Sequence, residues 1–438
     1  MKEPVSAGAP VKAPEILTGA KASLARLRFR GGFIKYLLKR KKYPLFIVRA
    51  SKGGARLTAR LLKEAKFGKV IRHNRTLRFS LSAPRWPSAA FDHMAANGGL
   101  NLAKAGTPLR LHVDQAILAI TRRCAFSCEH CYERFNLGDE DPVPFSRWRE
   151  VVEEIQEIGA GLITFSGGEP FLRYDDLIKL VAAGDKTASE FHVHTSGHGV
   201  TFERAKELKQ AGLEAAAVGL DDATPDHHDR LRGSPGAFRE AREALSHFGE
   251  AGLFTYMNTC LSQRLVRSGG LPKLLQLAHD AGVGAVRFLE PRPCGGYFGR
   301  DPESLFSELD RRQTEDFYAQ ANKGGPYAGL PFIFYERYIE APERLGCRLG
   351  GMSLFYIDSL GNVLPCVFVP VTFGNIMQED FGTIWKRMRE AAPRPLKAEC
   401  ASFTLADAIQ GKQASGLTMP IPYPKIKREW ESCLFANS

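Results

Sequence analysis

Apolar runs of strand length alternate with amphipathic segments through the middle of the chain. The apolar runs cover residues 116–120, 162–166, 191–195, 215–220, 254–261 and 285–289. Between them, apolar side chains recur three and four residues apart, a spacing that places them on one face of a helix. These helical segments cover residues 148–158, 177–183, 203–211, 238–251 and 271–281. Six strands separated by helices predict a parallel sheet of the α/β class, with functional groups at the carboxyl ends of its strands.

The N-terminal part does not follow this alternation. Residues 1–20 are small and proline-rich, which predicts disorder. Residues 24–42 and 55–66 carry basic amphipathic patterns that predict helices, and Pro44 ends the first of them. Residues 84–106 are rich in Pro and Gly and are interpreted as a linker or a wrap over the body.

The C-terminal part also differs, because the strand–helix alternation stops after about residue 301. There a Ser-Leu-Gly-Asn turn at 359–362 predicts a hairpin over residues 353–366. We therefore expect three regions. They are a basic N-terminal region (1–110), partly disordered or helical, a core (111–300), and a small C-terminal domain (301–438).

Charge is distributed unevenly along the chain, whose net charge is +12. Residues 1–110 hold 24 Lys and Arg against 4 Asp and Glu, and the remainder holds 36 against 44. A basic arm is thus joined to a mildly acidic body. The arm can lie on an anionic membrane surface, bind an acidic peptide or nucleic acid, or pack on the body with its charges in solvent. Its few aromatic residues disfavour nucleic acid.

The location of the protein follows from two absences in the sequence. No stretch approaches eighteen consecutive apolar residues, and the basic N-terminus lacks the apolar centre of a signal peptide. These features predict a cytoplasmic protein, with peripheral attachment to a membrane through the arm as the alternative. Nine cysteines in a reducing compartment favour metal ligation over disulfides.

Three cysteines lie within eight residues, in Cys124-Ala-Phe-Ser-Cys128-Glu-His-Cys131, directly after the first predicted strand. Three thiolates on one short loop can hold three irons of a 4Fe–4S cube and leave the fourth iron open to a small-molecule ligand. A zinc knuckle needs a second cysteine pair nearby, or His130 as a strained fourth ligand. A disulfide framework is typical of short secreted chains. The spacing favours an iron–sulfur site over both, and over surface thiols without a function.

This spacing resembles the Cys-x3-Cys-x2-Cys signature of the radical SAM enzymes. A second stretch, Phe165-Ser-Gly-Gly-Glu-Pro170, is similar to the segment with which that family holds the methionine amino group of S-adenosylmethionine (SAM). Gly167, Gly168 and Glu169 carry over to that role. Family members often place Tyr or Phe before the third cysteine, near the adenine, and His130 takes that position here. The resemblance implies a partial (β/α)6 barrel that binds SAM and a 4Fe–4S cluster.

Two later strand ends extend the resemblance. His194-Thr-Ser-Gly197 is similar to a family ending of the Thr-Asn-Gly type, which makes Ser196 a candidate SAM contact, with a simple turn as the alternative. The stretches 219–222 and 228–233 look like the family's Ser-Leu-Asp-Gly and His-Asp-x-x-Arg-Gly, with Gly219 in place of the Ser. Asp221 and Arg232 carry over as SAM-side contacts, and a helix cap is the alternative for Asp221.

Two further cysteines lie near predicted strand ends. If Asn258 faces the barrel interior, Cys260 does too, because side chains two apart on a strand share a face. A thiol there can donate a hydrogen atom to a substrate radical, or it can be a buried core cysteine. Cys294 precedes two glycines after the sixth strand and is either an extra cluster ligand or an ordinary loop residue.

The C-terminal cysteines suggest a second metal site. The predicted hairpin brings Cys347 and Cys366 near each other. Gly361-x4-Cys366, followed by Gly374-Asn-Ile376, resembles the start of the SPASM or twitch auxiliary-cluster domain, without the further cysteine run of a full SPASM domain. The resemblance implies one auxiliary 4Fe–4S cluster, with a four-cysteine zinc site as its rival. The expected ligands are Cys347, Cys366, Cys400 and Cys433.

Together the motifs imply an enzyme, an oxidoreductase that activates C–H bonds. In the family, one electron from the cluster cleaves SAM to a 5′-deoxyadenosyl radical, which abstracts a hydrogen atom from the substrate. The electron is expected from an external reductant of the flavodoxin or ferredoxin type. Because members with this auxiliary domain often modify peptides, a (ribosomal) peptide gripped by the basic arm is the expected substrate. No strand pattern of a winged-helix leader-binding domain is visible in residues 1–110.

Two alternatives remain open at this stage. One is a membrane-surface radical SAM enzyme that acts on a lipid or another apolar small molecule and is recruited through residues 21–80. The other is a non-catalytic iron–sulfur protein that relays electrons.

Overall fold

The computed structural model describes residues 13–39, 69–97, 113–393 and 400–435, apart from positions 342, 343, 345, 348 and 352. The helix expected at 55–66 lies outside the described residues. No helix within these ranges combines the length and the apolar character that crossing a bilayer requires.

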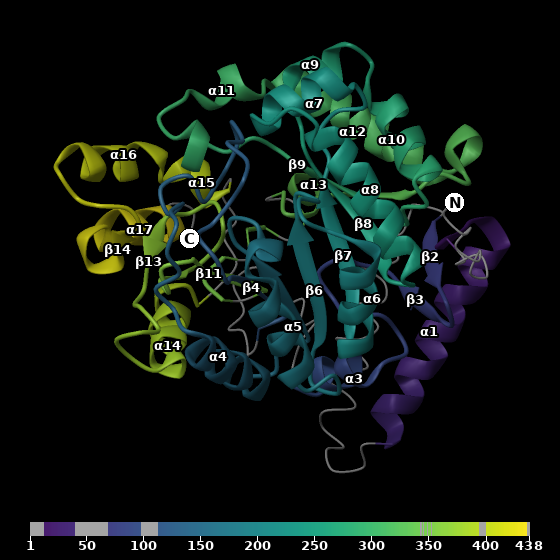
Figure 1. Cartoon of the computed structure of the whole chain (residues 1–438), viewed down its shortest axis with the longest axis horizontal. Coiled ribbons are helices and arrows are strands. Elements are labelled where there is room, and N and C mark those ends of the chain that lie inside the picture. Colours follow the sequence, from purple (N-terminus) through teal and green to yellow (C-terminus); the bar gives the residue numbers. More distant parts are fainter. Residues whose placement is uncertain are drawn as a thin grey trace, which may run out of the picture.

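A nine-stranded sheet forms the centre of the molecule (Figure 1). Its order is β10-β9-β8-β7-β6-β5-β4-β11-β12, and all neighbours are parallel except β11 and β12. The strands are β4 (Gln115–Ala119), β5 (Leu162–Ser166), β6 (Glu190–Thr195), β7 (Leu213–Gly219), β8 (Phe254–Cys260), β9 (Ala285–Leu289), β10 (Phe332–Tyr335), β11 (Leu354–Ile357) and β12 (Val363–Leu364). The six predicted strands are β4 to β9. The sheet continues past them through β10 and β11, so the pattern does not stop near residue 301 as expected.

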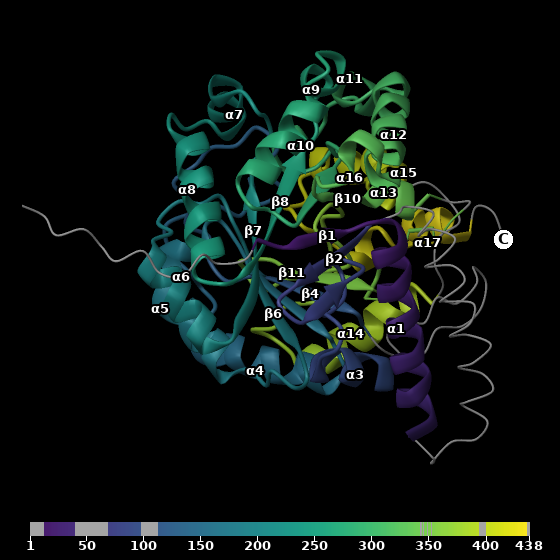
Figure 2. The same ribbon diagram turned by 90° about the vertical axis from the view of Figure 1, so that its right-hand side faces the viewer.

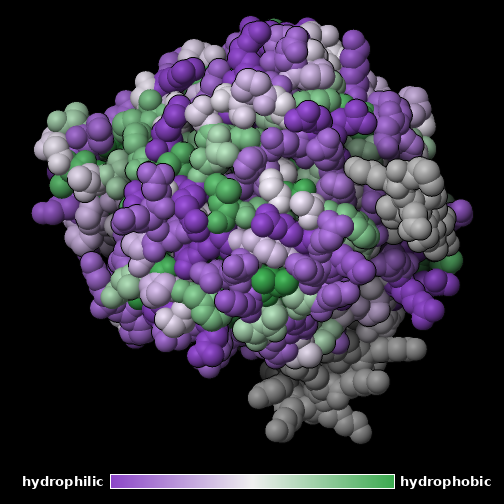
Figure 3. Space-filling view, in the orientation of Figure 1, coloured by the Kyte–Doolittle hydropathy of each residue, from purple (hydrophilic) through white to green (hydrophobic). Residues whose placement is uncertain are grey.

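Helices cover one face of this sheet, and Figure 2 shows α4, α5, α6 and α8 on that side. The helices that follow or precede the parallel strands are α4 (Phe145–Glu157), α5 (Tyr174–Ala183), α6 (Phe202–Ala211), α7 (Pro225–Arg232), α8 (Ala237–Glu250), α9 (Gln263–Arg267), α10 (Leu271–Asp280) and α12 (Glu308–Lys323). Their apolar stripes, such as Leu177 and Leu180 of α5, pack in one core with Ile163 and Phe165 of β5. Each such fully buried side chain stabilises the fold by about 1.5–3 kcal/mol. The surface seen in Figure 3 is mostly hydrophilic, with apolar side chains in small groups.

The N-terminal region forms a small unit on the opposite face of the sheet. β1 (Glu15–Leu17), β2 (Val70–His73) and β3 (Thr76–Arg78) make an antiparallel sheet with α1 (Gly19–Lys39) and α3 (Ala89–Ala96) beside it. Ile71 and Leu81 pack against Ala215, Ala217 and Tyr256 on the inner face of β7 and β8. Two expectations are corrected here. Residues 15–17 are a strand rather than disordered, and residues 1–110 do contain paired strands.

Basic side chains of this unit are partly buried against the body. Arg78 is 1% exposed, and its Nη1 lies 2.7 Å from Oε1 of Glu190. Arg85 Nη1 lies 3.0 Å from Oε2 of Glu214, and Lys69 Nζ donates to the carbonyl oxygen of Leu330 at 2.8 Å. Of the three interpretations of the basic arm, the described part therefore packs on the body. Several of its charges are buried in ion pairs, where the sequence analysis placed them in solvent.

The C-terminal region is joined directly to the central sheet. β11 pairs in parallel with β4, with Phe355 opposite Ala116, and β12 returns antiparallel to β11. This confirms the predicted hairpin. The other elements are α11 (Pro302–Leu305), α13 (Glu336–Ile339), β13 (Val371–Thr372), α14 (Phe381–Ala391), α15 (Ala401–Thr404), α16 (Ala406–Ala414), β14 (Ile421–Pro422) and α17 (Lys427–Phe435). Trp430 fixes α17 on this domain, because its Nε1 donates to Ala391 at 2.9 Å and its ring packs on Phe373.

Candidate active site

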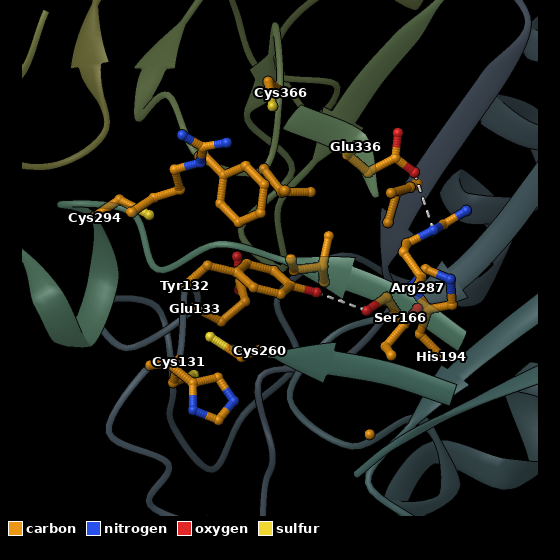
Figure 4. A pocket seen from close by; sticks show the side chains of 18 of the residues that line it. Cys131, Tyr132, Glu133, Ser166, His194, Cys260, Arg287, Cys294, Glu336 and Cys366 are labelled. Atoms are coloured by element: carbon orange, nitrogen blue, oxygen red, sulfur yellow. Dashed lines mark hydrogen bonds and ion pairs between the residues drawn. The ribbon is translucent and has the colours of Figure 1, made fainter. Parts of the chain in front are cut away.

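A cavity of about 300 Å³ lies at the carboxyl ends of the strands. Its walls come from the loop after β4, from the ends of β5 to β9, and from the C-terminal domain (Figure 4). Both predicted groups of cysteines contribute side chains to it. One space therefore connects the two candidate metal sites.

Cys124, Cys128 and Cys131 all line this cavity. Their loop is fixed by backbone hydrogen bonds to the end of α7, from Ser127 N–H to the Arg232 oxygen at 3.2 Å and from Glu129 N–H to the Leu231 oxygen at 2.9 Å. Burial raises the pKa of Cys124 to about 11 and that of Cys131 to about 12. A metal that binds these thiols must therefore displace their protons.

The thiol spacing bears on the choice between zinc and a cluster. Among the residues that the structure describes, no three Cys, His, Asp or Glu side chains converge on a single ion position. A structural zinc site needs four ligands around one ion, whereas a cube distributes its ligands over several irons. Three thiols on one loop that all line one cavity are the donor set of a cube whose fourth iron is open to a small-molecule ligand.

The Gly-Gly pair after β5 lets this strand end touch the cysteine loop. A Cβ on Gly168 would lie 2.2 Å from the carbonyl oxygen of Arg123, and one on Gly167 would lie 2.6 Å from that of Thr121. The same segments are hydrogen-bonded, from Gly168 N–H to the Thr121 oxygen at 2.8 Å. A side chain at either position would push the loop away. Both glycines line the cavity.

The carboxylate of Glu169 is buried and does not line the cavity. Oε1 accepts from the Thr195 hydroxyl at 2.7 Å and from Phe171 N–H at 3.1 Å. Oε2 accepts from the backbone N–H of Ser196 at 2.8 Å and from its hydroxyl at 2.5 Å. Glu169 thus holds Ser196, which does line the cavity, and the expected contact of Glu169 with SAM stays a prediction.

Asp221 lies at the centre of a buried network behind the cluster loop. Its Oδ2 is 2.8 Å from Arg232 Nε and 3.6 Å from His130 Nε2, and its Oδ1 accepts from Cys260 N–H at 2.9 Å. Burial disfavours the carboxylate, but Arg232 holds the pKa of Asp221 below its ordinary value. A Cβ on Gly219 would lie 2.3 Å from Arg232 Nη2, so the missing Ser makes room for this guanidinium.

His130 is neutral in this network. Burial lowers its pKa to about 4, against which the attraction of Asp221 is the smaller effect. Its Nδ1 is buried and has no hydrogen-bond partner among the described residues. The ring lines the cavity and is free to meet a ligand there.

Cys260 and Asn258 both line the cavity, which confirms that they share the inner face of β8. Burial raises the pKa of the Cys260 thiol well above its ordinary value. Figure 4 shows Cys260 near Cys131 and Tyr132. A neutral S–H at this position has the form that hydrogen-atom donation requires.

Sequence reasoning missed several polar side chains of the cavity. The Tyr132 and Ser166 hydroxyls lie 2.8 Å apart, and Arg287 Nε lies 3.2 Å from Glu336 Oε1 (Figure 4). His194 Nε2 is 3.0 Å from the Tyr256 hydroxyl. Strand parity offered a signal for Arg287, because it is two residues before the inward-facing Leu289. Nothing in the sequence pointed to Glu336, which lies beyond the predicted core.

A buried carboxylate joins the cluster loop to the C-terminal hairpin. Glu133 Oε2 accepts from the Ser359 hydroxyl at 2.7 Å, and Glu133 Oε1 accepts from the hydroxyl of Tyr356. Asn136 Nδ2 bridges Glu133 Oε1 at 3.2 Å and Asp358 Oδ2 at 3.3 Å. The first cysteine loop is thereby fixed to the second cysteine domain.

The remaining predicted ligands separate into two places. Cys294, Cys347, Cys366 and Cys400 line the far part of the cavity. Cys433 lies on α17 and does not line it, and its Sγ is 2.8 Å from the Thr404 hydroxyl.

Comparison with known proteins gives two domain matches. Residues 118–262 match the radical SAM superfamily, and residues 347–403 match the SPASM iron–sulfur cluster-binding domain. The AdoMet-dependent heme synthase of Methanosarcina barkeri (strain Fusaro / DSM 804) is 27% identical over 64% of this chain and 85% of its own. The PqqA peptide cyclase of Gluconobacter oxydans (strain 621H) is 25% identical over 61% and 74%.

Solved structures share the fold. SuiB of Streptococcus suis bound to its precursor peptide SuiA superposes with a TM-score of 0.52 at 18% identity, over 64% of this chain and 65% of SuiB. This chain therefore spans slightly less than two thirds of SuiB.

The parallel sheet and the cysteine-lined cavity, taken with these matches, identify an iron–sulfur enzyme of the α/β class. More specifically, residues 118–262 form a radical SAM domain and residues 347–403 a SPASM domain. The cofactors of this enzyme are a 4Fe–4S cluster and SAM, together with an auxiliary iron–sulfur cluster in the SPASM domain.

Proposed function

We propose that this enzyme abstracts a hydrogen atom from a side chain of a peptide substrate held in the cavity between the two cysteine groups. The observation that carries the proposal is that a single cavity of about 300 Å³ is lined by Cys124, Cys128 and Cys131 and also by cysteines of the SPASM domain. When bound, the first cluster and SAM supply a 5′-deoxyadenosyl radical. The residues of this chain hold the cofactors, orient the substrate and enclose the site.

In this proposal, the three loop thiols hold the first cluster and the strand ends bind SAM. The Gly167-Gly168 backbone provides close approach, and Ser196, positioned by Glu169, offers a hydroxyl to the polar end of SAM. The neutral His130 ring would lie beside the adenine. Asp221, which is itself paired with Arg232, contacts the ring on its Nε2 side. The buried Cys260 thiol would donate a hydrogen atom to the substrate radical. The thiyl radical left on Cys260 would return to S–H by taking up one proton from solvent and one electron from the external reductant.

A peptide substrate is supported by similar proteins and not by the cavity volume, because about 300 Å³ is the size of one small-molecule site before a substrate is added to SAM. The names of PqqA peptide cyclase and of SuiB with its precursor peptide agree with a peptide.

A second candidate substrate is a porphyrin, because relatives at 23–27% identity are named heme synthases. The buried Arg287 and Arg292 side chains in the cavity wall offer donors for carboxylates of such a molecule. Lipid substrates and membrane recruitment draw less support, because the described part of the basic arm packs on the body.

Two measurements test this function. Anaerobically reconstituted protein with SAM and dithionite is expected to release 5′-deoxyadenosine, and the Cys124→Ala variant is not. No 5′-deoxyadenosine from the intact protein would refute the enzyme mechanism.

The second measurement identifies the substrate class. Cells that express the protein are grown in heavy water, and their peptides are extracted and offered to the enzyme as substrate. Deuterium transfer from these peptides into 5′-deoxyadenosine is then measured. Transfer that protease treatment abolishes supports a peptide. If deuterium is transferred only from iron coproporphyrin III that was labelled in the same way, the porphyrin replaces the peptide as the candidate substrate.

A further inference from the structure

The fourth ligand of the auxiliary cluster can be chosen from the positions of the cysteines. Cys347, Cys366 and Cys400 line the cavity together with Cys294, which comes from the loop after β9 in the core. Cys433 is on α17, and its thiol is in contact with Thr404. Sequence order alone favours Cys433, whereas location favours Cys294.

The four cavity thiols are close enough to influence one another. The Cys347 and Cys400 thiols lie within hydrogen-bond reach of each other. Cys366 lies near both Cys400 and Cys294. Cys294 is 6% exposed and likewise faces Cys400. Four thiols around one space are the complete ligand set of a 4Fe–4S cube.

A buried cation lies beside these thiols. Arg292 is 8% exposed and lines the cavity, and its Nε and Nη1 have no hydrogen-bond partner among the described residues. The carboxylate of Glu290 is 3.7 Å from Nη1 and is shared with Arg311 at 3.6 Å. Leaving buried donors unused is costly. A cluster with four thiolates is negatively charged, and its sulfurs accept hydrogen bonds, so it matches this guanidinium.

The turn that carries Cys294 is held rigidly in place. Gly296 N–H donates to the carbonyl oxygen of Cys131 at 2.8 Å. A Cβ on Gly295 would lie 2.1 Å from that same oxygen, and one on Gly296 would lie 2.0 Å from the oxygen of Glu129. The two glycines are required for this contact. Their effect is to present the Cys294 thiol at a fixed position in the cavity wall.

We propose that Cys294, Cys347, Cys366 and Cys400 are the four ligands of the auxiliary 4Fe–4S cluster and that Arg292 hydrogen-bonds to its sulfurs. Cys433 is then not a ligand. The assignment deepens the proposed function and rests on it for the role of the cluster. With all four irons ligated by protein, the auxiliary cluster has no open position for substrate and acts as an electron carrier.

The test uses full-length protein in which Cys124, Cys128 and Cys131 are all replaced by Ala, so that the auxiliary cluster alone remains. Iron, acid-labile sulfide and the electron paramagnetic resonance (EPR) spectrum of the reduced protein are measured. This parent is expected to hold about four irons. Adding Cys294→Ala lowers the iron to about three or fewer and changes the spectrum. Adding Cys433→Ala, the matched control, changes neither.

A second readout uses the protein with both clusters, in case the triple variant does not fold. SAM perturbs the EPR signal of the cluster that it binds, and the part of the spectrum unmoved by SAM belongs to the auxiliary cluster. That part is expected to change in Cys294→Ala and not in Cys433→Ala. Arg292→Met is expected to keep the iron and to shift the auxiliary potential to more negative values, because it removes positive charge near the reduced cluster.

The assignment is overturned if Cys433→Ala lowers the auxiliary iron, or if Cys294→Ala leaves iron and spectrum unchanged. Neither result depends on SAM cleavage. Absence of 5′-deoxyadenosine from the intact protein would therefore count against the proposed function while leaving the ligand assignment standing.

Discussion

The backbone N–H of Gly296 donates a hydrogen bond to the carbonyl oxygen of Cys131, at 2.8 Å. Cys131 belongs to the first cysteine loop, and Gly296 is two residues after Cys294. One short turn thus sets the position of a thiol from each group. The separation between Cys131 and Cys294 is therefore set within the core.

Replacing Gly295 by Ala is expected to disturb the first cluster. The new Cβ would lie 2.1 Å from the Cys131 oxygen, so the cysteine loop must move. We expect cluster iron to fall and 5′-deoxyadenosine formation to drop by at least about tenfold, equivalent to ~1.4 kcal/mol. Gly299→Ala is the control, because Gly299 also has positive φ but has open space around it. Equal effects of the two variants would show that backbone strain, and not the contact with Cys131, is responsible.

Glu169→Gln is expected to weaken SAM binding through Ser196. Four hydrogen-bond donors point at the two carboxylate oxygens of Glu169. In the variant, the amide NH2 of the Gln side chain must face at least one of these donors. A buried donor left without its acceptor costs about 1–3 kcal/mol, so the KM for SAM should rise about tenfold or more. Glu150→Gln on the exposed side of α4 is the control. Unchanged SAM binding in Glu169→Gln would contradict the positioning role of this carboxylate.

Cys260→Ala separates SAM cleavage from completion of the reaction. Because the thiol lines the cavity beyond the cluster loop, its loss should leave 5′-deoxyadenosine formation within about twofold, a difference under ~0.5 kcal/mol. Deuterium from heavy water, which enters the product through an exchangeable thiol, should disappear from it. Product that still contains deuterium would show that another group supplies the hydrogen atom.

Arg78→Met is expected to destabilise the fold strongly. It leaves the buried carboxylate of Glu190 without its nearest cation, and breaking one side of a buried pair costs about 3–5 kcal/mol. Arg72→Met removes the exposed partner of Glu15 and should cost under about 1 kcal/mol. Urea unfolding of both variants measures the difference. Similar losses would mean that Glu190 finds another partner, for which Arg85 at 3.1 Å is placed.

Stability is expected to fall with acidification through His73. Burial lowers the pKa of His73 to about 4 from its ordinary 6.5. The unfolded chain therefore binds a proton between these values that the folded chain does not, so stability is lost as the pH falls from about 6.5 towards 4. This one group accounts for ~2 kcal/mol between pH 7 and 5. In His73→Gln the pH dependence of urea unfolding should be smaller by that amount, whereas an unchanged dependence would assign the loss to other groups, such as the buried His192.

Much of the core could be predicted because its signals are local. Apolar runs and helical spacing predicted β4 to β9 and the helices between them, and the motifs at the strand ends predicted part of the cavity lining. That Asn258 and Cys260 share one face of their strand followed from strand parity alone. Each of these inferences needed only neighbouring residues in the chain.

The rest depends on contacts between distant segments. The N-terminal strands are three or four residues long and gain their partner surface from β7 and β8. Burial of Arg78 could not be expected, since arginine is rarely buried without a partner and that partner, Glu190, is more than a hundred residues away. Choosing Cys294 over Cys433 required knowing that the loop after β9 faces the C-terminal domain. The Gly295-Gly296 pair is evident in the sequence, but its contact with the first cysteine loop is not.

The pairing of β11 with β4 has a consequence for how material passes through the enzyme. Main-chain hydrogen bonds join β11 of the C-terminal domain to β4 of the central sheet. The domain therefore cannot rotate away from the core by a hinge motion. Substrate and product must therefore pass between two domains that keep their relative position. Only side chains and connecting loops at the cavity entrance can rearrange to let them through. Rates of entry and release should accordingly respond to substitutions at the rim more than to solvent viscosity.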